Sequence, residues 1–554
     1  EILELFVEYA EFEDLVTIRQ GLATGNDERF VRKWWEVKED MLENDFVIYQ
    51  KSGGKEPYYD IPDDYLYWSK NGSEIREYDG GNGTPNEEYY FVEGLTFRNF
   101  GNYLTAREFT DEMIFSQTAI YATSQEIDTD YLTGLLCSTL YRFIANGINP
   151  GLHFEAGDVK RYPIKESPAS ENKISSLVLD GVKKRLNLST LNEASSDYSA
   201  RKFGEIIRQG SMNLLNYEER TQADVGAIHG AIDDIVFQEH EISLTAQQRC
   251  YENLPKNLAS YPHITNAGSL DTEEHEFREE VPTKELPEDE YEELIDEIDD
   301  LKDNDLREIS EELEVSPYTV AMVRHEHDLY TRDEKRKTAG RLLSYYLGCA
   351  MGRWELEGLE PDDDGIIVFD DGFDDNVMRF MRDCIELTYG EDELYSKEQE
   401  IEEMLNKDIE DWLRDTFFRY HHCKEYRRRG QRIPIYWQLA SDEGHFNCFV
   451  YYHRMDEDTL PKVRGQYLDE KIDRLRNRRD TLQSRISNAD DDEKPELRSE
   501  EEEIEEKIDD LTEFRDRLDN LIDEGFAPDF EAGIWENIQK VDEHDLLAVP
   551  LDKL

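Results

Sequence analysis

The sequence GLATGNDERFVRKWWEV, from Gly21 to Val37, decides how the first part of this chain is interpreted. Its two glycines allow the backbone to approach a ligand closely or to adopt a positive φ. The basic and aromatic residues that follow them stand beside hydroxyl and amide side chains, which can bind phosphates or base edges. On the residues alone, a glycine turn before a strand with core tryptophans is one interpretation, and a nucleic-acid contact is the other.

The rest of residues 1–168 has the pattern of a domain built from strands and loops. Short apolar segments such as Phe46–Tyr49 and Tyr89–Val92 alternate with glycine turns, among them Ser52–Gly54 and Asp79–Gly83. Such alternation is typical of strands joined by turns. One buried helix is predicted over Tyr131–Gly151, where the apolar spacing is helical.

Beyond residue 168 the pattern becomes mainly helical. Two heptad-like apolar stripes within residues 468–524 flank the polar segment Asn488–Glu496 and predict an antiparallel coiled-coil hairpin. We therefore expect an α+β fold, in which a strand-and-loop domain precedes a mostly helical C-terminal region. An acidic linker is expected over Thr272–Glu290. The predicted domains are residues 1–168, 169–345, 346–467, 468–524 and a tail over 525–554.

A helix-turn-helix is a candidate within residues 306–330. Ser316 has the residue type and position of an N-cap before the second helix. That helix carries Tyr318, Thr319 and Arg324, which could face a DNA groove. Helical pairs with this spacing also occur in protein cores, so both interpretations stay open.

The composition indicates an unusual environment. The chain has 554 residues, with 129 acidic and 63 basic side chains and a net charge of -66. Its 38% hydrophobic content still supplies a core, so we expect a folded protein adapted to a salt-rich, halophilic cytoplasm. At about 1 M salt the Debye length falls to about 3 Å, which screens the repulsion between carboxylates. Basic clusters retained in so acidic a chain are therefore informative.

Cysteine usage and hydropathy exclude several classes of protein. Six cysteines without any C-x-x-C pair argue for a reducing compartment and against a disulfide framework. No apolar segment approaches the roughly 20 residues of a membrane span, so we expect no membrane association. We expect no metal either, because the histidines and cysteines of the C-terminal region do not match a closed zinc site. They are His421, His422, Cys423, His445, Cys448 and His453.

A second basic cluster comprises Arg427, Arg428, Arg429 and Arg432, just before an apolar segment. Arginine binds phosphate through a planar fork of donors, so this cluster could hold a DNA backbone. Pairing with the abundant carboxylates of the chain explains it equally well. The two interpretations remain even.

Catalytic motifs are missing from the sequence. We find no Walker-type phosphate loop, no G-x-S-x-G elbow and no Asn-Pro-Pro-aromatic tetrapeptide. An acidic glycine-rich turn suited to S-adenosylmethionine is also missing. We therefore assign no catalytic or cofactor-binding residue to this chain.

Several motifs in a shared order nevertheless carry a family resemblance. They are the opening segment Gly21–Val37, the glycine turn Lys51–Lys55, Gly94–Phe97, Phe154–Ile164, Leu342–Trp354, Arg432–Leu439, Val450–Arg454 and the late helical hairpin. Together they resemble the target-recognition and C-terminal portion of the PglX family, the adenine-specific DNA methyltransferases of BREX phage-defence systems. The resemblance covers nearly the whole chain.

The resemblance implies an enzyme that transfers a methyl group from S-adenosylmethionine to adenine and so marks host DNA. Family members bind this cofactor, and hold the flipped adenine, in an N-terminal domain with the Asn-Pro-Pro-aromatic motif. The present sequence begins after the place where that domain would end, so we expect it to be inactive alone. Double-stranded DNA and other BREX subunits are the implied partners.

Within this resemblance, residues 1–168 become a DNA target-recognition domain. The side chains expected to contact DNA are hydroxyl, amide and basic groups: Thr24, Asn26, Arg29, Arg32, Lys33, Lys51, Thr96, Arg98, Lys160 and Arg161, with Arg427, Arg428, Arg429 and Arg432 from the C-terminal region. Two alternatives remain. One is the specificity portion of a fused restriction-modification enzyme, and the other is a non-enzymatic DNA-binding or scaffold protein.

Overall fold

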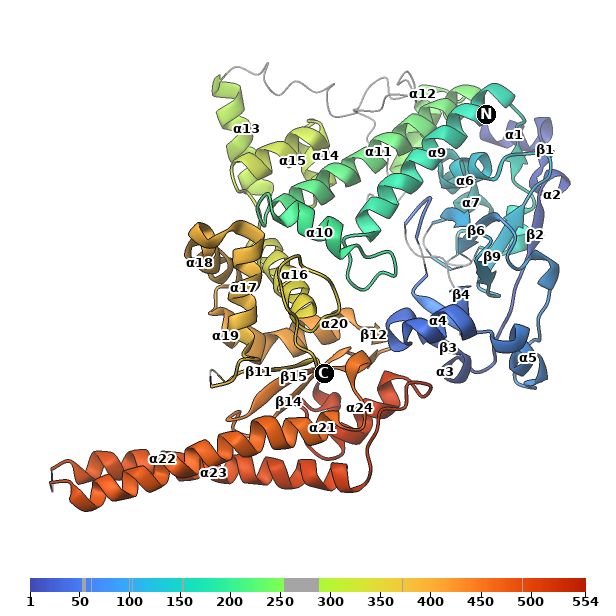
Figure 1. Cartoon of the computed structure of the whole chain (residues 1–554). Coiled ribbons are helices and arrows are strands. Elements are labelled where there is room, and N and C mark those ends of the chain that lie inside the picture. The colour runs from blue at the N-terminus through green and yellow to red at the C-terminus, as the bar shows by residue number, and fades with distance from the viewer. Residues whose placement is uncertain are drawn as a thin grey trace. The chain divides into compact units, whose positions relative to one another are not determined.

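The computed structural model describes residues 1–51, 56–60, 62–98, 100–101, 103–151, 154–253, 288–370, 372–490 and 492–554. The predicted turn at Ser52–Gly54 and most of the predicted linker lie outside these residues. The chain folds as two compact units (Figure 1). Unit 1 comprises residues 1–34, 39–203 and 212–331, and unit 2 comprises residues 35–38, 204–211 and 332–554.

Two four-stranded sheets form the first part of unit 1. One is antiparallel, with the order β2 (Thr17–Arg19), β9 (Ala119–Thr123), β6 (Gly94–Arg98) and β7 (Ala106–Phe109). The other has the order β3 (Val31–Lys33), β5 (Asp64–Tyr67), β4 (Phe46–Gln50) and β8 (Met113–Phe115), and β4 and β8 run parallel. Stacked rings of Phe115 and Tyr121, with centroids 4.8 Å apart, join the two sheets.

Short elements connect and flank these sheets. β1 (Ala10–Glu11) pairs with β10 (Pro163–Ile164). The helices are α1 (Ile2–Glu8), α2 (Phe12–Leu15), α3 (Asp27–Phe30), α4 (Glu39–Asp45), α5 (Ser69–Glu77), α8 (Ala156–Val159) and the 3-10 turns η1 (Trp34–Glu36) and η2 (Glu87–Tyr89). A strand-and-loop organisation is therefore present in this part of the chain.

The predicted buried helix over Tyr131–Gly151 is in fact two helices. α6 (Thr129–Cys137) ends at Ser138, whose ψ of 153° is extended, and α7 (Thr139–Ile148) begins directly after it. The Ser138 hydroxyl accepts a hydrogen bond from the Tyr141 amide and so caps α7. Apolar spacing alone did not reveal this cap inside the pattern.

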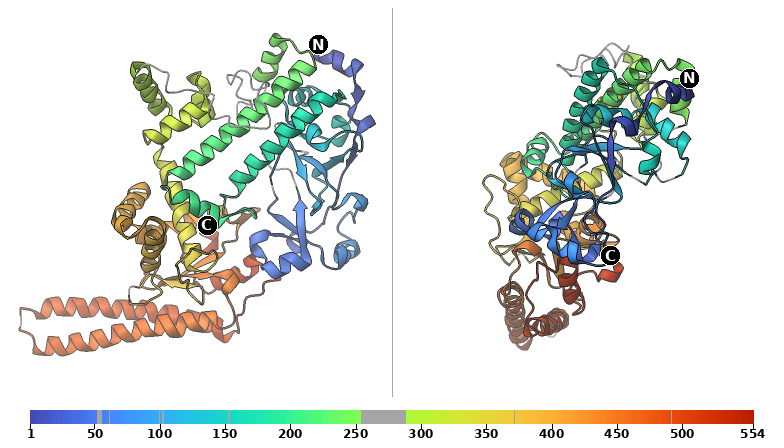
Figure 2. Two further views of the ribbon diagram at one scale, coloured as in Figure 1. Left: turned by 45° about the horizontal axis from the view of Figure 1, so that its top comes forward. Right: turned by 90° about the vertical axis from the view of Figure 1, so that its right-hand side faces the viewer.

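Long helices complete unit 1. α9 (Pro168–Ser189) and α11 (Asn213–Glu239) lie side by side in both views (Figures 1 and 2). The remaining helices are α10 (Ala200–Ile207), which crosses into unit 2, α12 (Leu244–Glu252), α13 (Glu288–Leu301), α14 (Leu306–Glu312) and α15 (Pro317–Glu326). Apart from α10, these helices contribute apolar side chains to one core with the first sheet, which includes Leu95, Leu132 and Ile228.

Unit 2 is built on a three-stranded antiparallel sheet, with the order β11 (Ile366–Val368), β15 (Asn447–Tyr451) and β14 (Tyr436–Ala440). Every residue of these strands is buried. The surrounding elements are α16 (Arg332–Ala350), α17 (Val377–Tyr389), α18 (Leu394–Leu405), α19 (Ile409–Trp412), the π-helix η7 (Leu413–His422), α20 (Cys423–Glu425), the pair β12 (Arg427–Arg428) and β13 (Gln431–Arg432), α21 (Thr459–Lys462), η9 (Val463–Leu468) and α24 (Ile534–Asp542).

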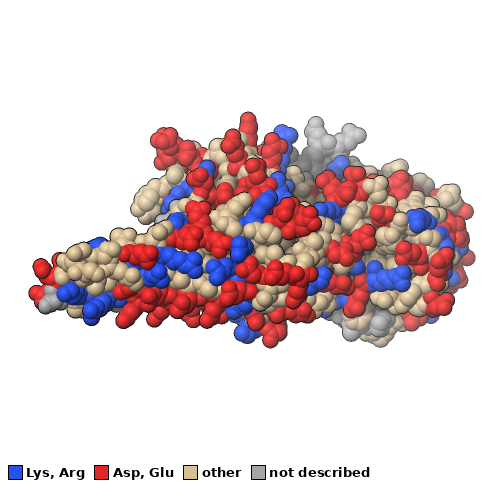
Figure 3. All heavy atoms as spheres, turned by 60° about the horizontal axis from the view of Figure 1, so that its bottom comes forward, with Lys and Arg blue, Asp and Glu red and all other residues tan. Residues whose placement is uncertain are grey.

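A helical hairpin extends from this sheet. α22 (Asp469–Asn488) and α23 (Lys494–Asp523) lie side by side, with Leu482, Leu497, Ile504 and Ile508 buried between them. Both predicted apolar stripes face inward, and coiled-coil geometry remains a prediction. Figure 3 shows acidic side chains over much of one face, together with Lys and Arg side chains along this hairpin. The fold is mixed α and β and mainly helical, as predicted.

Candidate nucleic-acid interface

The opening glycine segment forms a loop, Gln20–Asn26, between β2 and α3, which we call the recognition loop. At Gly21 a Cβ atom would lie 1.9 Å from the Phe115 carbonyl oxygen, so only glycine fits. Gly25 has a φ of 71°, and a Cβ there would lie 2.1 Å from the Gly80 carbonyl oxygen. Both glycines therefore permit close packing within the protein, whereas the sequence pattern predicted close approach to a ligand; the positive φ expected of a glycine is present at Gly25.

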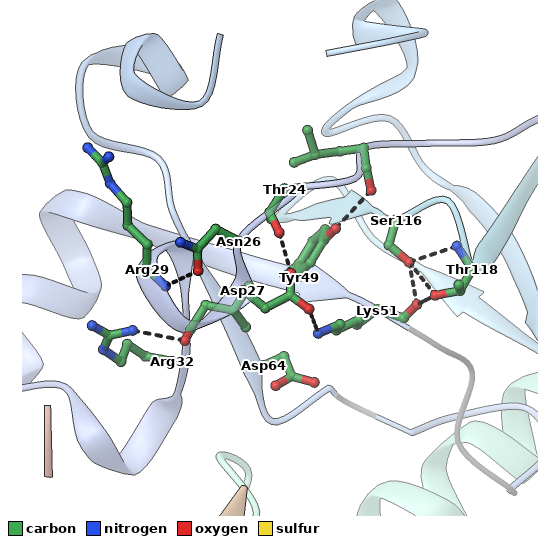
Figure 4. Close-up of polar contacts among 12 residues, drawn as sticks. Thr24, Asn26, Asp27, Arg29, Arg32, Tyr49, Lys51, Asp64, Ser116 and Thr118 are labelled. Atoms are coloured by element: carbon green, nitrogen blue, oxygen red, sulfur yellow. Dashed lines mark hydrogen bonds and ion pairs between the residues drawn. The ribbon is translucent and has the colours of Figure 1, made fainter. Parts of the chain in front are cut away.

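Polar side chains fix the end of this loop (Figure 4). The carboxylate of Asp27 accepts a hydrogen bond from the Thr24 hydroxyl and pairs with the Lys51 ammonium. The carbonyl oxygen of Lys51 accepts hydrogen bonds from the hydroxyls of Ser116 and Thr118. A continuous network thus connects the loop to the end of β4 and to the turn after β8.

Asn26 caps the short helix that follows. Its side-chain oxygen accepts a hydrogen bond of 3.1 Å from the Arg29 amide. This bond uses the side-chain oxygen of Asn26, which is a partly exposed residue (Figure 4). An amide NH₂ group in such a position can donate to a base edge or a phosphate.

The basic residues of the opening segment differ in exposure. Arg29 is 53% exposed and pairs with Glu74 at 2.9 Å, and its guanidinium lies 4.9 Å from the Phe30 ring centre. Lys33, at 17% exposure, lies 3.4 Å from Asp64 and 3.7 Å from Asp63. Burial raises the pKa of Asp63 to about 6, and the Lys33 ammonium opposes that rise. Arg32 is buried and donates to the Glu28 carbonyl oxygen.

Three of the residues expected to contact DNA are thus turned inward. Thr24, Arg32 and Thr96 are buried, and Thr96 lies in the middle of β6 with no exposed surface. Buried side chains cannot contact a duplex in this conformation. The inward orientation follows from close loop packing at Thr24 and from the central position of β6 in its sheet.

The other candidates of unit 1 lie elsewhere. Lys160 pairs with Glu13 at 3.5 Å and Arg161 with Asp158 at 3.1 Å, both beside the β1–β10 pair. Arg98 ends β6, and its side chain lies outside the described part of the chain. None of these residues has a contact with the recognition loop among the described residues.

The arginine cluster of unit 2 forms the small hairpin β12–β13, where Arg427 is the register partner of Arg432. Arg428 pairs at 2.8 Å with the fully buried Glu36, which belongs to the same unit. Arg432 donates to the carbonyl oxygen of Leu554 at 3.2 Å. Arg427 and Arg429 are exposed, and Arg429 has a φ of 49°. Intramolecular pairing therefore accounts for Arg428 and Arg432.

The helix-turn-helix candidate forms two helices, α14 and α15, and Ser316 caps the second as predicted. The side chains expected to read DNA are buried, however. Tyr318 donates to Asp224 at 2.9 Å, Arg324 pairs with Glu219, and Thr319 has almost no exposed surface. Because α15 packs against α11 with this face, a DNA-reading role for it is not supported.

The histidines and cysteines of unit 2 have separate structural partners. His422 is buried, and its Nε2 accepts hydrogen bonds from the amides of Ile435 and Tyr436. Burial lowers the pKa of His422, which keeps the ring neutral. His445 contacts Asp510 at 2.9 Å, and Cys423 and Cys448 are buried. Across the described ranges, no three His, Cys, Asp or Glu side chains gather as a metal site would require.

Sequence reasoning missed the loop Asp79–Asn86 as a neighbour of the recognition loop. Asn82 makes three hydrogen bonds with Gly21 and Ala23, and Asn86 donates to the Gln20 carbonyl oxygen at 2.8 Å. The segment Asp79–Gly83 was recognisable only as a turn. Nothing in the sequence indicated that it pairs with a loop about 60 residues earlier.

The described helices include none that combines the length and the apolar character needed to cross a bilayer.

No known family profile matches the chain. It is 22% identical, over an alignment of 587 residues, to the adenine-specific methyltransferase BrxX of Escherichia coli O9:H4 (strain HS), covering 96% of this chain and 42% of BrxX. It is 25% identical over 239 residues to the adenine-specific methyltransferase PglX of Lacticaseibacillus casei (strain Zhang), covering 38% of this chain and 20% of that protein. The chain therefore spans less than half the length of these relatives. The chain is therefore similar over nearly its whole length to one adenine-specific methyltransferase, BrxX, and over part of its length to a second, PglX.

Proposed function

We propose that unit 1 recognises the DNA target site of an adenine-specific methyltransferase that marks host DNA in BREX phage defence. The recognition loop and α3 would read the duplex while the target adenine is flipped for methylation. S-adenosylmethionine would supply the methyl group, and we assign none of its contacts to this chain. The chain would contribute site recognition and a scaffold for the reaction.

One observation carries this proposal: a glycine loop that is fixed from inside the protein and still leaves polar groups outside. Gly21, Leu22 and Thr24 are buried and make the contacts of the loop with the protein interior. Gly25 is exposed, and Asn26 and Arg29 retain exposed surface. Sequence readout needs donors held in a defined position. A loop held in this way, which presents the Asn26 amide and leads into α3 with the Arg29 guanidinium, meets that need.

The acidic surroundings are compatible with DNA binding. Arg29, Lys160 and Arg161 each pair with a carboxylate at the surface. Exposed ion pairs contribute only about 0–1 kcal/mol, so a phosphate or a guanine edge can replace the carboxylate at small cost. In concentrated salt, counterion release contributes less to affinity, and base-edge hydrogen bonds contribute relatively more.

The proposed contact set is smaller than the residue types suggested. Asn26 and Arg29 are the primary contacts, and Lys51 supports the loop through Asp27. Lys33 pairs with Asp63 and Asp64 beside β5. Arg98, Lys160, Arg161, Arg427 and Arg429 remain candidates for phosphate contacts. Thr24, Arg32, Thr96, Arg428 and Arg432 serve the fold.

Paired alanine substitutions test the proposal. Arg29→Ala with Lys33→Ala should weaken specific DNA binding by about tenfold or more, because one base contact typically contributes about 1–3 kcal/mol. The matched control is Lys183→Ala with Arg336→Ala, which removes the same charge from two exposed ion pairs. Binding is measured in molar KCl by fluorescence anisotropy, with circular dichroism to confirm folding. Equal affinities for both double variants would contradict the placement of the interface.

A further inference from the structure

The loop Asp79–Asn86, between α5 and η2, is attached to the recognition loop mainly through one residue. The backbone amide of Asn82 donates to the Ala23 carbonyl oxygen at 3.1 Å. Its side-chain oxygen accepts from the Ala23 amide at 2.7 Å, and its side-chain nitrogen donates to the Gly21 carbonyl oxygen at 3.3 Å. Asn82 therefore supplies hydrogen bonds that the backbone of the recognition loop would otherwise lack.

The two loops also pack closely, backbone against backbone. A Cβ at Gly81 would lie 2.7 Å from the Ala23 carbonyl oxygen, and one at Gly25 would lie 2.1 Å from the Gly80 carbonyl oxygen. Only glycine at these two positions allows this close approach. The hydrogen bonds of Asn82 hold the loops together at this separation.

The opposite side of the recognition loop rests on the sheet. The Leu22 amide donates to the Phe115 carbonyl oxygen at 3.1 Å, and the Tyr49 hydroxyl donates to the Leu22 carbonyl oxygen at 2.9 Å. These contacts are buried, and any change to them would disturb the core. Asn82 is exposed, so its contribution to loop position can be removed separately.

We infer that Asn82 is a positioning residue for sequence specificity. It holds the backbone of Ala23–Asn26 so that Asn26 and Arg29 meet the duplex in one register, without touching DNA itself. This inference rests on the function proposed above. Discrimination between base pairs requires donors placed within about 0.5 Å, whereas non-specific affinity depends on charge alone. Loss of Asn82 should therefore relax specificity more than it weakens binding.

The test is a selection from duplexes with a randomised core, using the 554-residue chain itself. The wild type should enrich one motif. Asn82→Ala should enrich a degenerate motif, with discrimination against mismatched sites reduced about tenfold or more and an unchanged salt dependence of binding. Asn82→Asp keeps the acceptor for the Ala23 amide and loses the donor to Gly21, so its specificity should lie between the two.

Thr84→Ala is the matched control, because Thr84 lies in the same loop and its hydroxyl bonds to Glu87 instead of the recognition loop. It should enrich the wild-type motif. The inference is overturned if Asn82→Ala enriches the wild-type motif with undiminished discrimination, or if Thr84→Ala relaxes specificity equally. If the wild type enriches no motif at all, the proposed function fails, and the inference fails with it.

Discussion

Glu36 is a carboxylate with no exposed surface, and Arg428 lies 2.8 Å from it in the same unit. Trp35, next to Glu36, makes two further contacts. Its ring packs edge-on against Tyr426, and the Trp35 carbonyl oxygen lies 2.7 Å from His453 Nε2. Removing one member of a buried pair leaves the other charge uncompensated. The segment after β3 is therefore held in unit 2 by charge as well as by packing.

Arg428→Ala should lower the free energy of unfolding of unit 2 by about 3–5 kcal/mol, because Glu36 would stay buried without its partner. Arg427→Ala is the matched control: the neighbouring side chain is exposed, and its loss should change stability by no more than about 0.5 kcal/mol. Urea unfolding followed by circular dichroism measures both. Equal stabilities for the two variants would show that the pair is not important for folding.

His453 gives a prediction for pH. Burial lowers the pKa of His453 to about 4 in the folded protein, against about 6.5 when unfolded. As the pH falls, His453 binds a proton in the unfolded chain before it does so in the folded protein. Its contribution to the free energy of unfolding is therefore complete above pH 6.5 and is lost as the pH falls toward 4. The loss should be at most about 3 kcal/mol.

His453→Gln tests this dependence. Glutamine can keep the donor to the Trp35 carbonyl oxygen and cannot be protonated in this range. The unfolding free energy of the variant should therefore fall less than that of the wild type between pH 6.5 and 4. Parallel pH profiles would exclude the proposed titration.

For single residues, the sequence predicts which chemical groups are present better than it predicts which of them are exposed to solvent. The glycines of the recognition loop were recognisable because their residue type is specific. The burial of Arg32 was not, because β3 has only three residues and so has no alternating pattern that shows which face is buried. Asn82 was missed because its partner lies far away in the sequence.

Among the elements, the α22–α23 hairpin carries many charged side chains of both signs. α22 has six basic and four acidic residues, whereas α23 has five basic and thirteen acidic ones. Apart from its buried stripe, this hairpin presents charged faces that suit a protein partner. We propose that other BREX subunits dock there.

Deleting residues 478–500 and joining the helices by a short linker should leave DNA methylation intact and abolish phage exclusion. Methylation should survive because the core of unit 2 is separate from the tip of the hairpin. The contact between Asp510 and His445 at the base of the hairpin also remains. The deletion is compared with Leu482→Ala, which should loosen the hairpin without shortening it. Adenine methylation is read by sequencing and exclusion by plaque counts. Lost methylation would instead assign the hairpin a role in the reaction.

The spacing of apolar residues predicted some helices better than others. The hairpin stripes extend over many turns, so helical spacing was unambiguous. The break at Ser138 was hidden, since a capping serine inside an apolar pattern resembles a helix interior residue. The α14–α15 pair was correctly predicted as helices, but periodicity cannot show whether the packed face is the DNA-reading one.

For the whole molecule, the net charge of -66 sets the conditions under which binding must be studied. Many of the few cations are paired with carboxylates, including Arg29, Lys33 and Lys51. Composition predicted this acidic surface and a halophilic setting, which remains a proposal. It could not predict which surface faces DNA, because that depends on contacts between distant loops.

The most direct test is amide hydrogen exchange of this protein in molar KCl, with and without a duplex that carries its selected motif. Bound DNA should slow exchange in residues 20–33 and 78–86, because both loops of the interface become covered or fixed. Exchange in β12–β13 and in the hairpin tip is the internal reference. Unchanged exchange in both loops, with protection confined to unit 2, would contradict the assignment of DNA recognition to unit 1.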